Sequence, residues 1–183
     1  MRTKALQAPL PLEGGTASPA PAPVLPYQVP ELKVLRLAEY PVDWRTVDKP
    51  DQVACTWREA VEKAPWYDQD KECLVVFLLN TRKRLLGFHL VTLGTLDTCH
   101  AHPREVFRVA IAGGAQAIVL AHNHPSGEAS PSEADIKVTR DLIRAGQILK
   151  IELLDHVIVG KPDPSQAHLP GWVSLRELGY FYS

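Results

Sequence analysis

The chain has 183 residues, of which 45% are hydrophobic and 22% are charged, and its formal net charge is -1. This length and composition suit one ordinary domain and exclude a collagen-like or wholly disordered chain. The near-zero net charge gives no global electrostatic attraction to nucleic acids or to anionic membranes.

The cysteines are sparse and widely spaced, and no two of them form a C-x-x-C pair. We therefore expect neither a disulfide scaffold nor a cysteine-type zinc finger, and we expect a reducing compartment. The longest apolar run, Cys73 to Leu79, is too short to span a bilayer, and no signal peptide is apparent. These features predict a cytoplasmic protein without a membrane segment.

Residues 1–30 hold seven of the 16 prolines and few bulky apolar side chains. Such a segment buries too little apolar surface to offset the entropy of ordering, so we predict a proline-rich disordered tail. The composition changes at Glu31, and we expect one domain over residues 31–183. Its first strand is expected around Leu32 to Leu35.

Helical spacing of apolar residues predicts a helix over 50–63. Cys73 to Leu79 is a continuous β-rich run, which is typical of a strand buried on both faces. A polar turn separates this run from 84–92, where apolar and polar residues alternate. The two segments are therefore predicted to form a hairpin.

The second half of the chain continues the alternation of helices and strands. Pro103 is expected to begin a helix that ends at Gly113 and Gly114. A short buried strand is predicted over 117–121, followed by a polar loop over 122–130.

The next helix is predicted to begin with Ser130 as its N-cap, Pro131 at the first helical position and Glu133 completing a capping box. Gly146 is expected to end this helix. A strand over 151–159 follows, and 172–182 closes the domain. This order of elements predicts a three-layer α/β sandwich.

One polar segment carries the residues for metal chemistry. His122 and His124 lie two positions apart, so an extended chain directs both imidazoles to the same side. Asp135 lies in the following helix, with Ser132 three residues earlier on the same helical face. Two imidazoles and one carboxylate suit Zn²⁺ with an open position for water, although two loop histidines that bind no metal remain an alternative at this point.

The spacing of these residues resembles the JAMM (JAB/MPN) metalloprotease motif, H-x-H-P-x6-S-x-x-D. The strings HNHPSG and SPSEAD, together with ELLDHVIVG further on, resemble the RadC branch of that family. The resemblance covers roughly residues 31–183. It implies the JAB/MPN architecture, a cytidine-deaminase-like three-layer α/β sandwich with a mixed sheet.

The resemblance also implies roles for individual residues. Ser132 would hydrogen-bond the oxyanion or the water at the metal. The general base of the family is a glutamate just before a buried strand, which favours Glu72, with Glu105 as the alternative. The implied Zn²⁺ ligands are His122, His124 and Asp135.

Two function classes follow from these residues. The first is a zinc-dependent metallopeptidase or isopeptidase that acts on a peptide or protein substrate. The alternative is a DNA-repair-associated RadC module that binds or cleaves nucleic acid, which the near-zero net charge does not favour. Asp155 and His156 are predicted either to orient the ligands or to be buried core groups. The sequence predicts no oligomeric state.

Overall fold

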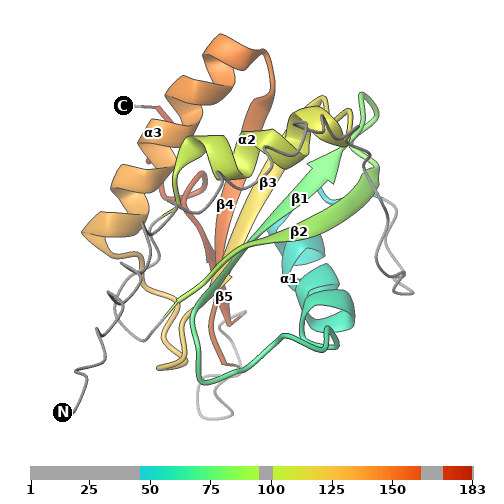
Figure 1. Ribbon diagram of the computed structural model, residues 1–183. Coiled ribbons are helices and arrows are strands. Elements are labelled where there is room, and N and C mark those ends of the chain that lie inside the picture. Colours follow the sequence, from blue (N-terminus) through green and yellow to red (C-terminus); the bar gives the residue numbers. More distant parts are fainter. Residues whose placement is uncertain (1–45, 95–100, 162–170, 183) are drawn as a thin grey trace, which may run out of the picture. The chain divides into compact units, whose positions relative to one another are not determined.

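The computed structural model describes residues 46–94, 101–161 and 171–182 (Figure 1). All of these belong to one compact unit, Val34–Ser183. The predicted tail over 1–30 and the predicted strand at Leu32 to Leu35 lie outside the described residues.

The described elements alternate between helix and strand, as expected for an α/β protein. In chain order they are α1 (Pro50–Thr56), a π-helical turn η1 (Trp57–Val61), β1 (Cys73–Leu79), β2 (Leu85–Leu93), α2 (Pro103–Ala112), β3 (Ala117–Asn123), α3 (Glu133–Leu149), β4 (Glu152–Val159) and β5 (Trp172–Ser174). The strands form one sheet in the order β2-β1-β3-β4-β5. Only the β3–β4 pair is parallel, so the sheet is mixed, as predicted.

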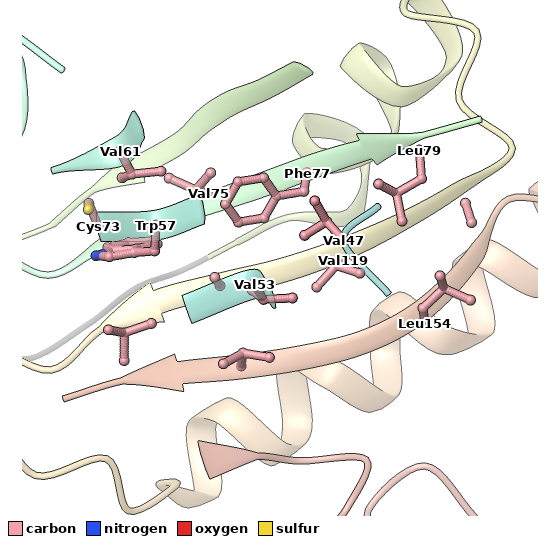
Figure 2. Close-up of a cluster of buried hydrophobic side chains, with 14 residues drawn as sticks. Val47, Val53, Trp57, Val61, Cys73, Val75, Phe77, Leu79, Val119 and Leu154 are labelled. Atoms are coloured by element: carbon pink, nitrogen blue, oxygen red, sulfur yellow. The ribbon is translucent and has the colours of Figure 1, made fainter. Parts of the chain in front are cut away.

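Helices cover both faces of this sheet. On one face, Trp57 and its neighbours from α1 and η1 pack against side chains of β1 and β3, including Phe77 and Val119 (Figure 2). Helices α2 and α3 lie on the other face (Figure 1). Phe107 of α2 and Leu142 of α3 belong to a second buried cluster there. The predicted three-layer sandwich is therefore confirmed.

Strand β1 lies at the centre of this packing, and all seven of its residues are buried. This confirms the prediction of a strand buried on both faces. The predicted hairpin is also confirmed, because β1 pairs antiparallel with β2 from Cys73↔Leu93 to Leu79↔Leu85. Asn80 closes the turn, with Oδ1 accepting hydrogen bonds from the backbone N–H groups of Arg82 and Arg84.

Helix α3 begins and ends later than the sequence predicts. Its N-cap is Ser132 and not Ser130, and the capping box is formed with Asp135 and not with Glu133. Gly146 does not end the helix. A Cβ there would lie 2.5 Å from the carbonyl oxygen of Ile151, so this glycine permits close packing of the chain that returns from α3.

Two other predicted boundaries are wrong. The loop over 122–130 was predicted to include His122 and Asn123, but both belong to β3, where His122 pairs with Leu74 of β1 and Ile158 of β4. The helix over 50–63 is regular only to Thr56 and continues as the π-helical turn to Val61. Neighbouring strands and packing extend or distort elements beyond what local patterns indicate.

A register shift in the parallel pair positions one further polar residue. Ile118 pairs with Leu153, whereas the next residue, Val119, pairs with Asp155. This extra residue in β4 places His156 opposite Leu120, on the sheet face that α3 covers. His156 and His122 therefore lie on the same face.

Two simpler expectations concern membrane segments and disulfides. Over residues 46–94, 101–161 and 171–182, no helix is both long enough and apolar enough to cross a membrane. Cys55 and Cys73, which lie within these ranges, are not joined by a disulfide.

Candidate metal centre

Three side chains meet at the carboxyl end of the parallel strand pair. His122 lies at the end of β3, His124 is the first residue after that strand, and Asp135 lies in the first turn of α3. One ligand atom from each residue can be chosen so that all three lie within 4.8 Å of one another. The structure therefore brings together the three residues predicted as zinc ligands.

His122 reaches the cluster through Nε2. This atom lies 3.0 Å from Nε2 of His124 and 3.3 Å from Oδ1 of Asp135. The other ring nitrogen, Nδ1, lies 2.8 Å from Nε2 of His156. Burial and the nearby His156 hold the pKa of His122 well below its usual range, so this imidazole is neutral.

His124 is oriented by the loop that follows β3. Its Nδ1 lies 2.7 Å from the carbonyl oxygen of Glu128, which only accepts, so Nδ1 carries the hydrogen and Nε2 faces the cluster. The loop packs closely on the end of β4, since a Cβ on Gly160 would lie 2.4 Å from the carbonyl oxygen of Gly127. Burial lowers the pKa of His124, but the Asp135 carboxylate, the hydrogen bond to Glu128 and the charge of Glu72 together raise it above its usual value.

Asp135 is fixed by the capping box of α3. Its Oδ2 accepts hydrogen bonds from the backbone N–H of Ser132 at 2.8 Å and from the Ser132 hydroxyl at 2.6 Å. Burial raises the pKa of this carboxyl, but His124, His122 and Ser132 together offset that effect and hold it below its usual range. The carboxylate is therefore ionised, as metal binding requires.

The donor set fits a zinc ion on its chemistry and on its dimensions. Ligands at the usual tetrahedral distances from Zn²⁺ lie about 3.3 Å from one another. Here the two Nε2 atoms lie 3.0 Å apart, and each lies near that spacing from one oxygen of Asp135: His122 Nε2 is 3.3 Å from Oδ1 and His124 Nε2 is 3.7 Å from Oδ2. Both imidazoles also have their Nδ1 atoms engaged on the protein side, which is typical of histidine ligands.

Glu72 lies immediately before β1, two residues from Leu74, which pairs with His122. Burial raises the pKa of its carboxyl, His124 lowers it, and the charge of Asp135 raises it. The strand pairing therefore places Glu72 at the end of the sheet where β3 carries the predicted ligands. Glu105, the alternative general base, lies on α2 and forms an ion pair of 2.9 Å with Arg108.

Asn123 connects the histidine segment to the backbone around Glu72. Its Oδ1 accepts a hydrogen bond of 2.9 Å from the N–H of Cys73, and its Nδ2 donates one of 3.0 Å to the carbonyl of Lys71. The amide thus holds the peptide groups on both sides of Glu72. Asn123 occupies the unspecified position between the two histidines of the motif, so the motif gives no signal of this role.

Of the pair Asp155 and His156, only His156 contacts a predicted ligand. Asp155 instead accepts hydrogen bonds from the Ser174 hydroxyl at 2.7 Å and from backbone N–H groups. Thr139 of α3 is not among the predicted site residues, yet its hydroxyl lies 2.6 Å from Nδ1 of His156. Its position four residues after Asp135 was the available sequence signal.

We expect the zinc-free protein to lose stability in acid because of His156. Burial lowers the pKa of His156 from 6.5 to about 4, so between these values the unfolded chain binds a proton that the folded chain does not. The contribution of neutral His156 to the free energy of unfolding is fully present above pH 6.5 and is lost as the pH falls toward 4. Its complete loss lowers the free energy of unfolding by about 3 kcal/mol. Denaturant midpoints measured from pH 7.5 to 4 check this. The midpoint of His156→Gln should fall less with decreasing pH than the midpoint of wild type, and equal decreases would contradict the prediction.

Comparison with known proteins places the chain in a family. The family model of the RadC-like JAB domain matches residues 47–180. The chain belongs to this family. The matched range contains the predicted zinc ligands and Glu72, so the expected RadC resemblance is confirmed.

The curated relatives carry uninformative names. The chain is 41% identical over 138 residues to UPF0758 protein tlr1707 of Thermosynechococcus vestitus, covering 75% of this chain and 50% of that protein. It is 48% identical over 110 residues to a UPF0758 protein of Chlorobaculum parvum, and the match covers 60% of this chain and 46% of that protein. A UPF0758 protein of Moorella thermoacetica is 53% identical over 91 residues, covering 50% and 40%. The chain thus spans about half the length of these relatives.

Proposed function

We propose that this RadC-like JAB domain is a zinc-dependent hydrolase of the JAMM type, acting as a metallopeptidase or isopeptidase. The observation that carries this proposal is the convergence of two imidazole Nε2 atoms and one carboxylate, at the end of the sheet where Glu72 precedes β1. A structural zinc site is closed by four protein ligands. Among the described residues, only three offer ligand atoms here, which suits a catalytic centre.

Each residue has a role that follows from its position. His122, His124 and Asp135 hold the zinc, which supplies Lewis acidity and lowers the pKa of water to roughly 7. The Glu72 carboxylate accepts a proton from the attacking water and delivers it to the leaving amine. A raised pKa suits the first transfer, because the carboxylate of a weaker acid is a stronger base.

Ser132 is assigned to the oxyanion of the reacting carbonyl. Its hydroxyl lies at the cluster, 2.6 Å from Oδ2 of Asp135, and its single hydrogen would turn from that oxygen to the oxyanion. A hydroxyl donor at such a point stabilises negative charge that develops on the carbonyl oxygen. The substrate class in this proposal is a peptide or isopeptide, and the cellular location is the cytoplasm.

Metal analysis and a substrate panel test the function. The purified protein is loaded with Zn²⁺ and offered peptide libraries, isopeptide-linked lysine substrates, and single-stranded and branched DNA. We expect one zinc per chain, cleavage in a peptide or isopeptide arm, and loss of cleavage on chelation. Zinc binding without cleavage in either arm would overturn the peptidase assignment, and metal-dependent DNA cleavage would replace it with the nucleic-acid alternative.

Asn123→Ala should slow cleavage without releasing zinc. The substitution removes the two hydrogen bonds that hold the backbone around Glu72, and a small displacement of a catalytic group costs roughly 10 to 10²-fold in kcat. Steady-state kinetics and zinc titration measure the two effects separately. Asn80→Ala is the matched control, because the Asn80 side chain also makes two hydrogen bonds to the backbone, at the far end of β1. Equal kcat values in Asn123→Ala and wild type would contradict this expectation.

A further inference from the structure

Behind the candidate metal centre, a chain of hydrogen-bond contacts leads from His122 back to the helix that carries Asp135. Nδ1 of His122 lies 2.8 Å from Nε2 of His156, and Nδ1 of His156 lies 2.6 Å from Oγ1 of Thr139. The same Oγ1 lies 2.6 Å from the backbone carbonyl oxygen of Asp135. The three side chains are each at most 1% exposed, so these atoms depend on one another as partners.

We call this chain of contacts the relay. The backbone carbonyl of Asp135, at one end of the relay, fixes the direction of every hydrogen bond in it. A carbonyl oxygen only accepts, so Thr139 donates its single hydroxyl hydrogen to Asp135. Thr139 Oγ1 must then accept from His156, which places the ring hydrogen of His156 on Nδ1. Nε2 of His156 in turn accepts from Nδ1 of His122. His122 is left with a lone pair on Nε2, the atom that faces the cluster.

The opposite direction is disfavoured at the carbonyl end, and at the other end it is incompatible with metal binding. If Thr139 donated to His156, its oxygen lone pairs would face those of the Asp135 carbonyl at 2.6 Å with no hydrogen between them. His156 would then donate to His122, and the His122 hydrogen would lie on Nε2. That hydrogen would occupy the position from which His122 must bind a metal.

We propose that Thr139 and His156 are positioning residues that select the metal-binding tautomer of His122, with the backbone carbonyl of Asp135 as the fixed end of the relay. This inference rests on the proposed zinc site. The same helical turn would then set two ligands at once, since Asp135 supplies its carboxylate directly and its carbonyl orients His122 through the relay.

The first test reads the tautomers in the zinc-free protein. Long-range proton–nitrogen NMR on isotope-labelled histidine reports which ring nitrogen carries the hydrogen. Wild type and Thr139→Ser should show the hydrogen on Nδ1 of both His122 and His156. Thr139→Val removes the acceptor for Nδ1 of His156, so we expect both rings to move their hydrogen to Nε2. A hydrogen on Nε2 of His122 in wild type, or unchanged tautomers in Thr139→Val, would overturn the proposal.

The second test measures zinc affinity by competition with a chelator. Thr139→Val should bind zinc roughly 10 to 100-fold more weakly, and Thr139→Ser should restore the affinity. Thr56→Val is the matched control, because Thr56 is also buried and its hydroxyl also donates to the carbonyl oxygen four residues earlier. Oγ1 of Thr56 lies 2.8 Å from the carbonyl oxygen of Gln52. Equal affinities in the two valine variants would overturn the proposal. If wild type binds no zinc, the proposed function fails, while the NMR test still judges the relay.

Discussion

Replacing Glu72 with glutamine should lower kcat by roughly 10² to 10⁴-fold while leaving one zinc bound per chain. Glutamine keeps the shape of the side chain but cannot accept the proton from water, and general-base catalysis contributes a factor of this size. The carboxyl responds to the charges of His124 and Asp135 and is not one of the three clustered ligands. Cleavage kinetics and metal analysis on the same preparation measure both parts of the prediction.

The pH profile gives an independent readout of the same role. Glu72 must be ionised to accept a proton, and burial raises its pKa above the ordinary value of 4.5. Activity should therefore rise with pH through a pKa above 4.5, and the residual activity of Glu72→Gln should lack that limb.

Glu105→Gln is the matched control for this prediction. Glu105 lies on α2 in an ion pair with Arg108, so its neutralisation should leave kcat within a few-fold of wild type. A large loss in Glu105→Gln together with an active Glu72→Gln would move the general base to α2.

Replacing Asp135 with asparagine should weaken zinc binding by roughly 10²-fold or more. Zinc sites with four ligands bind with about 10–16 kcal/mol, so one charged ligand carries on the order of 3 kcal/mol. Asparagine retains an oxygen for the capping contacts with Ser132, so helix α3 should persist. Chelator competition measures the affinity, and circular dichroism checks the helix.

A second signature distinguishes loss of the carboxylate from general damage. In the zinc-free protein, the charge of Asp135 raises the pKa of His124. We expect Asp135→Asn to lower that pKa, which an NMR titration of His124 measures. Asp141→Asn is the control on the same helix, since Asp141 is exposed and paired with Arg144, and it should change neither zinc affinity nor this pKa. Wild-type zinc affinity in Asp135→Asn would remove Asp135 from the ligand set.

Much of the fold follows from local patterns. The apolar run at Cys73 to Leu79 predicted a doubly buried strand with its observed bounds. The alternation of helices and strands predicted three layers, and Pro103 marks the start of α2. These features depend on residues within one element, where side-chain periodicity reports directly on burial.

Boundaries at the site were predicted less well because tertiary contacts set them. Local chemistry offers two capping boxes, one from Ser130 to Glu133 and one from Ser132 to Asp135, and the structure adopts the second. That choice orients the Asp135 carboxylate toward His122 and His124. Gly146 resembles a helix stop in sequence, but its role is to permit the close approach of Ile151.

The sequence by itself determined which residues are candidates for metal chemistry. With 45% apolar residues, near-zero charge and few cysteines, the chain suits a globular domain whose candidate metal ligands are nitrogen and oxygen atoms. The resemblance to the JAMM motif predicted His122, His124 and Asp135 as those ligands, and the structure brings the three side chains together.

Only the tertiary structure decided which groups surround the ligands. Asn123 meets Cys73 across 50 positions of sequence, and His156 meets His122 across 34. Sheet pairing and the register shift in β4 set these contacts, and no local spacing encodes either of them. A short motif therefore predicts the candidate metal ligands, whereas the orientation of their side chains arises from the way the strands align.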